Sequence, residues 1–261
     1  AGIQPILGME AYVAPRSMLD REGSKDREYA HLVLLCKNET GYQNLMLLSS
    51  EAFLKGFYYK PRIDYDLLEA HTEGLICLSA CLAGDIPQAL LRGDYEGALT
   101  HAKRLKDMFQ EDFYIELQNH GLPEQLRVLP DLRRIAAELN VRCVATNDVH
   151  YVNREDAEAQ DALLCIQTQR FVDEEDRMRM ETDQFYLKSA DEMLAALDGD
   201  MAALETSAEI VEKCHLEIAF GIQRMPAFTA PEGRDNAEHL RAVCEEGMEK
   251  KVPQADDAAK E

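Results

Sequence analysis

Two residues that can bind a metal ion follow an apolar run near the middle of the chain. The run Val141–Ala145 reads VRCVA and is followed by Asn147, Asp148, Val149 and His150. Alternate side chains of an extended segment point to one face, so the Asp-x-His spacing places Asp148 and His150 on the same side. A carboxylate and an imidazole in this arrangement can be two ligands of one metal cluster.

Three further residues occupy comparable positions in other apolar runs. Cys81 follows the run LICLS, and Glu10 lies within or just past the run PILGMEAYV. His31 opens the next run, HLVLLC, and would lie near Glu10 if these two runs pair as an antiparallel hairpin. One Cys, two His, one Asp and one Glu together suit zinc, manganese or iron better than calcium.

Each of these residues also has a purely structural interpretation. An Asp after a strand is often a turn residue or a helix cap, and a lone Cys is more often core filler than a ligand. Spacing alone therefore leaves the metal site as an open hypothesis. His120 is intermediate between a site residue and a loop residue. The other histidines are interpreted as surface or packing residues: His71, His101, His215 and His239.

Alternating strands and helices must position these side chains. Short apolar runs predict strands at Pro5–Val13, His31–Cys36, Leu75–Ser79, Phe113–Leu117 and Val141–Ala145. Apolar residues at helical spacing predict helices at Thr40–Leu54, Tyr95–Phe109 and Glu124–Leu139, and Pro130 is expected to bend or break the third. The alternation predicts an α/β fold with a parallel sheet, open or closed, whose strands are buried on both faces.

The remaining segments are polar or helical. Arg16–Glu28 is linker-like, so the first two strands are expected to form a long hairpin arm. From about Asp156 onward strand signals fade, and Met225–Gly233 is a connector punctuated by Pro and Gly. Pro253–Glu261 is expected to be frayed. The helices predicted in this half are Ala190–Leu197, Ala202–Cys214 and Asn236–Lys251.

Composition limits the classes of partner. The 261 residues carry a net charge of -21, which repels phosphate backbones and makes the chain as a whole a poor candidate for gripping DNA. Seven cysteines without a CxxC pair indicate reduced, mostly buried thiols and a cytoplasmic location. No apolar run approaches the ~18 residues of a membrane-spanning helix. The start at Ala1 predicts that the chain begins inside a longer gene product.

Seven strings, in order along nearly the whole chain, resemble one known family. They are GIQPILGMEAYVAP from Gly2, HLVLLCKNETGYQNL from His31, GFYYKPRI from Gly56, LSACLAGDIPQ from Leu78, ELQNHG from Glu116, ATNDVHY from Ala145 and FYLKS from Phe185. They are specific together, although no single string would be. On these strings the chain resembles the polymerase-and-histidinol-phosphatase (PHP) domain of the alpha subunit of bacterial DNA polymerase III.

The resemblance implies a distorted (β/α)7 TIM-like barrel over residues 1–222, followed by a helical connector toward the polymerase palm over residues 223–261. Strand ends in that family hold up to three metal ions. The matching ligand positions here are Glu10, His31, Cys81, Asp148 and His150. The family's H-x-H and T-D-H motifs do not occur in this sequence, so we expect an N-terminally truncated fragment that lacks the first two strand–helix units.

The resemblance also implies functions. The parent protein would be a replicative DNA-directed DNA polymerase, a nucleotidyltransferase that uses magnesium at an active site outside this chain. The domain itself would be a phosphoesterase or 3′→5′ exonuclease holding zinc or manganese, or else magnesium. Asp148 and Glu10 would be its catalytic carboxylates, and one of them would accept a proton.

Two alternatives remain open. The domain could be a non-catalytic scaffold that docks a separate proofreading exonuclease subunit, or a stand-alone phosphoesterase of the histidinol-phosphatase type. The expected partners are the rest of the alpha subunit, the exonuclease subunit, the sliding clamp through the holoenzyme, and DNA through other domains. No membrane partner is expected.

Overall fold

The computed structural model describes residues 2–222 and 225–254, which fall into two compact units. The first unit is Ala1–Glu217 and the second is Ile218–Glu261. The boundary that we expect from the sequence lies later, after residue 222. Most of the segment predicted to be frayed, Pro253–Glu261, lies outside the described residues.

The first unit is built around a seven-stranded sheet of order β3-β4-β1-β2-β5-β6-β7. The strands are β1 (Gly8–Val13), β2 (Ala30–Cys36), β3 (Phe57–Tyr58), β4 (Lys60–Ile63), β5 (Leu75–Leu78), β6 (Phe113–Leu117) and β7 (Arg142–Ala145). β1 pairs antiparallel with β2, which confirms the predicted hairpin. In this pairing Tyr12 lies opposite His31, and Glu10 lies opposite Val33.

The prediction of a parallel sheet is wrong for the middle of the sheet and for the β3–β4 pair at its edge, which is antiparallel. β1–β4, β5–β6 and β6–β7 are parallel, but β2 is antiparallel to both of its neighbours, β1 and β5. The hairpin causes this difference, because it reverses the chain direction within the sheet. Side chains of β2 alternate between buried and half-buried, whereas every residue of β5 and β6 is buried. The sheet is therefore mixed.

Helices separate most of the strands and confirm the α/β class. They are α1 (Glu39–Leu54), α2 (Tyr65–Glu69), α3 (Asp85–Leu91), α4 (Tyr95–Phe109), α5 (Pro123–Leu139), α6 (Ala157–Thr168), α7 (Ala190–Ala196) and α8 (Met201–Lys213) in the first unit, and α9 (Asn236–Lys251) in the second. The strands and their covering helices are consistent with the TIM-like architecture that the resemblance implies.

We expected Pro130 to bend or break this helix; α5 runs through Pro130 without interruption, so a break is excluded. A proline leaves the carbonyl four residues earlier without its helical donor, here that of Leu126. Both Pro130 and Leu126 are exposed, so water can satisfy that carbonyl.

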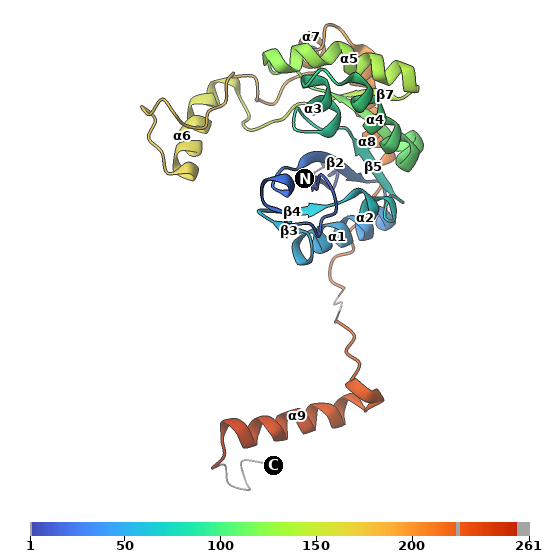
Figure 1. Cartoon of the computed structure of the whole chain (residues 1–261), viewed down its shortest axis with the longest axis vertical. Coiled ribbons are helices and arrows are strands. Elements are labelled where there is room, and N and C mark those ends of the chain that lie inside the picture. Colours follow the sequence, from blue (N-terminus) through green and yellow to red (C-terminus); the bar gives the residue numbers. More distant parts are fainter. Residues whose placement is uncertain (1, 223–224, 255–261) are drawn as a thin grey trace. The chain divides into compact units, whose positions relative to one another are not determined.

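Two hydrophobic layers cover the two faces of the sheet. On one face, Leu32 and Leu34 of β2 join the large core cluster with Leu45 and Leu48 of α1, which lies along the sheet together with α2 (Figure 1). On the other face, a smaller cluster joins Ile76 of β5 with residues of β6, β7 and α8. At the β1–β2 end of this second face the side chains are only partly buried, and the candidate ligands project there.

The segment Arg16–Glu28 is a fixed loop rather than the predicted linker. The guanidinium of Arg62 is fully buried and donates to the carbonyl oxygens of Met18, Asp20, Asp26 and Gly56 at 2.6–3.2 Å. Three of these acceptors, Met18, Asp20 and Asp26, belong to the loop, so one rigid donor holds the loop against β4. The loop therefore has a fixed position next to the β1–β2 hairpin.

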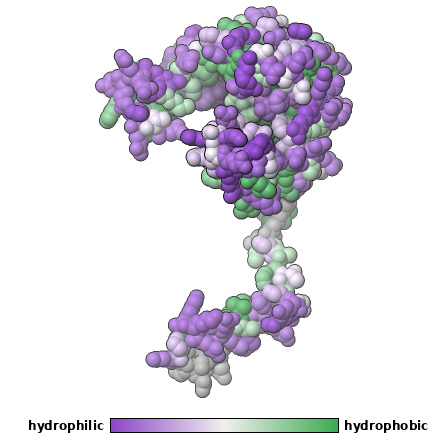
Figure 2. Space-filling model, viewed as in Figure 1, coloured by the Kyte–Doolittle hydropathy of each residue, from purple (hydrophilic) through white to green (hydrophobic). Residues whose placement is uncertain are grey.

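The surface in Figure 2 is dominated by hydrophilic residues, as the net charge of -21 leads one to expect. α6 and the residues after it form an arm that projects from the first unit (Figure 1). In the part of the chain that the structure describes, no helix is long and apolar enough to cross a bilayer.

Candidate metal centre

Three of the expected ligands converge at the exposed end of the second sheet face. Glu10 lies on β1, His31 on β2, and Cys81 in the loop after β5. Nδ1 of His31 lies 3.0 Å from Oε1 of Glu10 and 3.5 Å from Sγ of Cys81, and that sulfur lies 3.9 Å from the same Glu10 oxygen. Their ligand atoms all lie within 4.8 Å of one another, close enough to surround one cation.

The hairpin register brings Glu10 and His31 together. Glu10 and Tyr12 share one face of β1, and His31 lies opposite Tyr12, so Glu10 and His31 are diagonal neighbours across the pair. Ala11 and Val13 point to the opposite face and belong to the large core cluster. A register shift of one residue would bury Glu10 and expose this core, so packing fixes the pairing of the two ligands.

The backbone around Cys81 is held in an uncommon conformation. Ala80 is buried and has a φ of 64°, in the left-handed region that residues with a side chain seldom adopt. The loop then turns at Gly84, where an added Cβ would lie 2.4 Å from the carbonyl oxygen of Ser79. The carbonyl of Ala83 accepts the main-chain N–H of His31. The loop that carries Cys81 is thus bonded directly to the strand that carries His31.

The three side chains favour a positive charge between them. Hydrogen bonding to Cys81 and to Glu10 raises the pKa of His31 to about 10. The hydrogen bond from His31 lowers the pKa of Glu10 against the opposing effect of partial burial. In this state a proton on the imidazole supplies the positive charge that a metal ion would otherwise supply.

Asp148 and His150 form a separate pair after β7. Nδ1 of His150 lies 3.6 Å from Oδ1 of Asp148, and both side chains are partly exposed. Neither belongs to the group of three whose ligand atoms lie within 4.8 Å. His150 is nevertheless near enough to Glu10 for its charge to help lower the Glu10 pKa. The structure thus brings three expected ligands together and leaves the other two as a neighbouring pair.

A buried histidine supports the Asp148–His150 segment. His120 is only 1% exposed, and its Nε2 lies 3.3 Å from the main-chain nitrogen of Asp148. Its ring stacks on Phe185 at 4.3 Å, and the carbonyl of Phe185 accepts the N–H of His150 at 2.8 Å. Burial lowers the pKa of His120, which keeps the ring neutral. Of its two interpretations from the sequence, the structure favours the one near the site.

Glu116 also belongs to this region, although we did not predict it from the sequence. It is 4% exposed on β6, and its Oε1 accepts from Thr146 at 2.5 Å and from Gln118 at 2.9 Å. Its Oε2 has no partner among the described residues, and burial raises its pKa. Glu116 and Cys81 line the same small cavity. The available signal was a single carboxylate within the otherwise apolar run FYIEL.

The chemistry of the donor set fits a transition metal. A carboxylate oxygen, an imidazole nitrogen and a thiolate sulfur are ligands that zinc accepts together, whereas magnesium and calcium take oxygen ligands. No other group of three such residues within 4.8 Å occurs in residues 2–222 and 225–254. Glu10, His31 and Cys81 are therefore the candidate centre.

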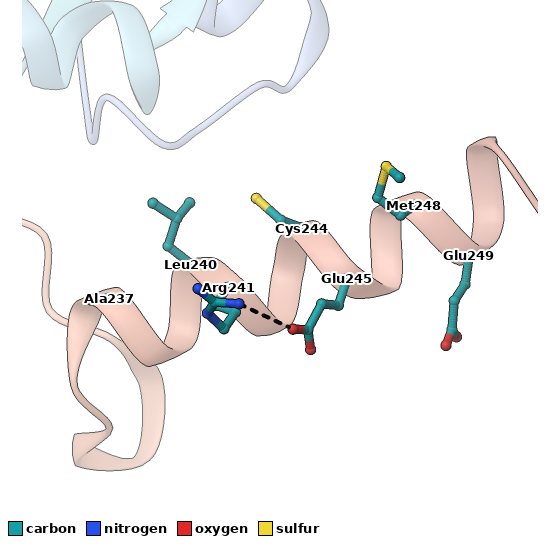
Figure 3. Close-up of a pocket in the computed structure, with 7 residues that line it drawn as sticks. All are labelled: Ala237, Leu240, Arg241, Cys244, Glu245, Met248 and Glu249. Carbon is teal, nitrogen blue, oxygen red and sulfur yellow. Dashed lines mark ion pairs between the residues drawn. The ribbon is translucent and has the colours of Figure 1, made fainter. Parts of the chain in front are cut away.

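A groove along α9 in the second unit lacks this character. Leu240, Cys244 and Met248 point to one side of the helix, and Arg241 pairs with Glu245 at 4.0 Å (Figure 3). The groove contains one thiol and carboxylates, but it offers no convergent set of ligands. It is an exposed helix face and not a second centre.

Comparison with known proteins agrees with the α/β architecture. Residues 1–120 match the PHP domain. The chain is 43% identical over 250 residues to the DNA polymerase III subunit alpha of Treponema pallidum, covering 95% of this chain and 21% of that protein. It is 43% identical over 261 residues to the Thermus aquaticus subunit, with 97% and 21% covered, and 44% identical over 251 residues to the Borreliella burgdorferi subunit, with 95% and 22% covered.

These relatives match nearly the whole length of this chain. The chain spans about a fifth of the length of each of them. The chain belongs to the family of bacterial DNA polymerase III alpha subunits and contains that family's PHP domain.

Proposed function

We propose that this chain is a metal-dependent phosphoesterase domain, of the 3′→5′ exonuclease type, within a replicative DNA polymerase alpha subunit. The observation that carries the proposal is the convergence of Glu10, His31 and Cys81 within 4.8 Å. We assign the finer domain limits, 1–222 for the barrel-like domain and 223–261 for the connector, to the same proposal. The free cysteines fit the reducing conditions of the cytoplasm.

The proposed roles follow from the surroundings of each residue. His31 and Cys81 hold zinc or manganese, with magnesium as a weaker candidate because of the sulfur ligand. Glu10 also holds the ion, since its lowered pKa keeps it ionised and makes it a poor proton acceptor. Asp148 is the better candidate to accept a proton, because its carboxylate is half exposed and faces His150. His150 completes the ligand set.

The proposed reaction is hydrolysis of a terminal phosphodiester. A bound divalent cation supplies neutralisation of phosphate charge and activation of water. A water oxygen forms the new bond to phosphorus, the bond from phosphorus to the 3′ oxygen breaks, and that oxygen takes up a proton. Asp148 accepts the proton of the attacking water. His120 holds the main chain of Asp148 and does not touch the reacting atoms.

Metal analysis of the purified chain tests this proposal. We expect zinc or manganese to co-purify or to bind with stoichiometry near one, and Asp148→Ala to reduce metal content or to abolish hydrolysis of a labelled single strand. Metal content and hydrolysis both unchanged in Asp148→Ala would remove that residue from the site. Failure of the wild-type chain to bind either metal would reject the metal-centre proposal.

Polymerisation belongs to the parent protein in this proposal. Nucleotidyl transfer needs carboxylates that hold two magnesium ions around the triphosphate, and we place them in the part of the relatives that this chain does not match. We therefore expect the 261-residue chain to show no primer extension. DNA contact for that reaction would be made through other domains.

A second candidate function is protein docking. α6 and the arm after it expose Leu163, Ile166, Phe171, Val172 and Met178, with exposed fractions between 58% and 75%. Apolar patches of this kind are typical of interaction sites. The candidate partners are the rest of the alpha subunit and a proofreading exonuclease subunit, with the sliding clamp reached through the holoenzyme. A pull-down with the exonuclease subunit, repeated with Ile166→Asp and Phe171→Asp, tests this role.

The alternative function within the PHP family is that of a stand-alone phosphatase of the histidinol-phosphatase type. Relatives named as polymerase subunits match 95% of this chain, including the residues beyond the PHP match, and this favours the polymerase assignment. Rapid hydrolysis of histidinol phosphate by the chain, without hydrolysis of single-stranded DNA, would reverse the preference.

A further inference from the structure

Aromatic and cationic side chains lie next to the candidate metal centre, on the β1–β2 hairpin and on the adjacent β3–β4 turn. They are Tyr12 on β1, Tyr29 just before β2, Tyr59 and Lys60 at the β3–β4 turn, and Arg27 in the preceding loop. We call these five residues the tyrosine shelf. Each of them is half-buried or exposed. The metal centre does not use any of them.

The shelf is continuous with the ligand His31. The rings of Tyr12 and Tyr29 lie 5.4 Å and 5.9 Å from the His31 ring, and Tyr29 is parallel to that ring within 6°. Tyr12 and Tyr29 also contact each other edge to face at 4.7 Å. Aromatic rings therefore begin directly at the centre and extend away from it over β1.

Two cations lie over tyrosine rings of the shelf. Lys60 Nζ lies 5.4 Å from the centroid of the Tyr12 ring, and the guanidinium carbon of Arg27 lies 4.8 Å from that of Tyr59. In the described parts of the chain, neither cation has a carboxylate within 4.0 Å. The nearby acid Asp26 is instead paired with Arg16. The two positive charges thus remain available to an anion.

The backbone at Tyr59 is strained. Tyr59 has a φ of 61°, in the left-handed region, and its side chain is 60% exposed. Tight turns of this kind favour glycine or asparagine, because a Cβ is disfavoured in this conformation. A large exposed ring at such a position contributes little to folding, and strained residues of this kind cluster at functional sites.

We propose that the tyrosine shelf binds the single-stranded 3′ end of a nucleic acid whose terminal phosphodiester reaches the Glu10–His31–Cys81 centre. The inference rests on the proposed exonuclease function and assigns the residues that hold its substrate. Bases stack on tyrosine rings regardless of sequence, and lysine or arginine beside the rings pairs with the phosphates. When a base stacks on Tyr12 or Tyr59, the cation that lay over that ring, Lys60 or Arg27, pairs with a phosphate instead.

The net charge of the chain is compatible only with a short nucleic-acid contact, such as one made by two cations. A net charge of -21 opposes an extended nucleic-acid track. Two cations account for two phosphates, so the logarithm of the binding constant falls with the logarithm of salt concentration with a slope of about -1.4 for a single strand. Duplex ends bind more weakly, because their bases are already stacked and paired.

Oligonucleotide binding by the full 261-residue chain in EDTA tests the shelf without metal-dependent turnover. The probe is a 5′-fluorescein oligo(dT) of eight nucleotides, followed by anisotropy. We expect Tyr59→Gly to weaken binding on the order of 10-fold, Tyr59→Phe to retain it, and Lys60→Gln to lower the salt slope by about 0.7. Because glycine relieves the left-handed strain, Tyr59→Gly should not lower the Tm, so its loss of binding cannot come from unfolding.

Tyr95→Leu is the matched control. Tyr95 is a half-buried tyrosine that also carries a cation, Arg134, at 4.2 Å from its ring, but it lies on α4. Binding that is unchanged in Tyr59→Gly, or that falls equally in Tyr95→Leu, would overturn the shelf. Equal affinity for a blunt duplex of the same length would also overturn it, and would point to a nonspecific electrostatic contact.

The same assay separates the shelf from the metal centre. Cys81→Ala should retain oligo(dT) binding in EDTA while losing metal. If oligo(dT) binding needs Tyr59 but the chain binds no metal, the shelf stands and the phosphoesterase proposal fails. The opposite result is also possible. Wild type and Tyr59→Gly could both bind metal, hydrolyse a small phosphodiester such as thymidine 5′-p-nitrophenyl phosphate equally, and bind oligo(dT) equally. The phosphoesterase proposal would then stand and the shelf would fail.

Discussion

Nδ1 of His31 lies 3.0 Å from Oε1 of Glu10, and the two residues come from adjacent antiparallel strands. This contact makes the metal centre depend on the register of the hairpin. With Cys81 Sγ at 3.5 Å from the same nitrogen, the imidazole is the common neighbour of both other ligands. Its removal should therefore affect the centre more than the removal of an outer residue.

We expect His31→Gln and Cys81→Ala each to weaken zinc or manganese binding by at least 100-fold, because each removes a direct ligand. Competition titration with a chromogenic chelator measures the change. Cys244→Ala is the control for Cys81→Ala, since Cys244 is an exposed thiol on α9. Equal metal affinity of the Cys81 and Cys244 variants would show that the thiol near His31 is not a ligand.

The second prediction concerns His120, whose buried ring contacts the main chain of Asp148 and so holds the segment of Asp148 and His150 in place. His120→Ala removes a buried ring that stacks on Phe185 and also contacts Gln125 through Nδ1 at 2.8 Å. We expect a loss of about 2–4 kcal/mol in the free energy of unfolding, from lost packing and an unsatisfied Gln125. Hydrogen exchange at the Asp148 amide should accelerate. Exchange that remains unchanged would contradict the supporting role.

Features that depend on residues in neighbouring segments of the sequence could be predicted, whereas features that depend on contacts between distant segments could not. The hairpin could be predicted because Glu10 and His31 lie in adjacent apolar runs. Alternate residues of each strand point to opposite faces of the sheet, so the sequence also indicates which side chains share a face. Cys81 could be identified as a candidate because it follows a strand. β4 was missed because Pro61 and two cations mask a short strand that is defined only by its neighbours.

Other features depend on contacts that no local pattern reveals. Arg62 looks like a surface cation in the sequence, but it is fully buried because three carbonyl groups of a distant loop and that of the nearby Gly56 meet at its guanidinium. The Asp148–His150 spacing predicts a shared face, but it does not predict how far that pair lies from Cys81. Glu116 is a similar case, because its burial depends on α5 and on the loop after β5.

The third prediction tests the burial of Arg62. Arg62→Lys keeps the charge but replaces the planar donor group with one ammonium, which cannot reach all of Met18, Asp20, Asp26 and Gly56. We expect the free energy of unfolding to fall by about 3 kcal/mol or more, because buried carbonyl groups and a buried charge lose their partners. Denaturant unfolding measures the change. Arg241→Lys on α9 should have no measurable effect, and a similarly small effect of Arg62→Lys would contradict the assigned role.

The fourth prediction is a pH dependence that originates at Asp26. The guanidinium of Arg16, which donates to both carboxylate oxygens at 3.0 and 2.8 Å, lowers the pKa of Asp26, and the N–H of Glu22 adds to the effect. A carboxyl group whose pKa is lower in the folded state binds fewer protons there than in the unfolded chain. Its contribution to stability is therefore complete above the ordinary value of 3.8 and is lost as the pH falls through the lower, folded pKa.

We expect Asp26→Asn to be less stable than the wild type at pH 7, and the difference to narrow as the pH falls below about 4. Denaturant unfolding at pH 7, 5, 4 and 3 gives the two curves. Asp173→Asn, at an exposed aspartate of the α6 arm, should follow the wild-type curve at every pH. A constant difference between Asp26→Asn and the wild type from pH 7 to pH 3 would mean that the pairing with Arg16 does not shift the protonation of Asp26. The fixed position of the loop beside the tyrosine shelf would then depend on Arg62 alone.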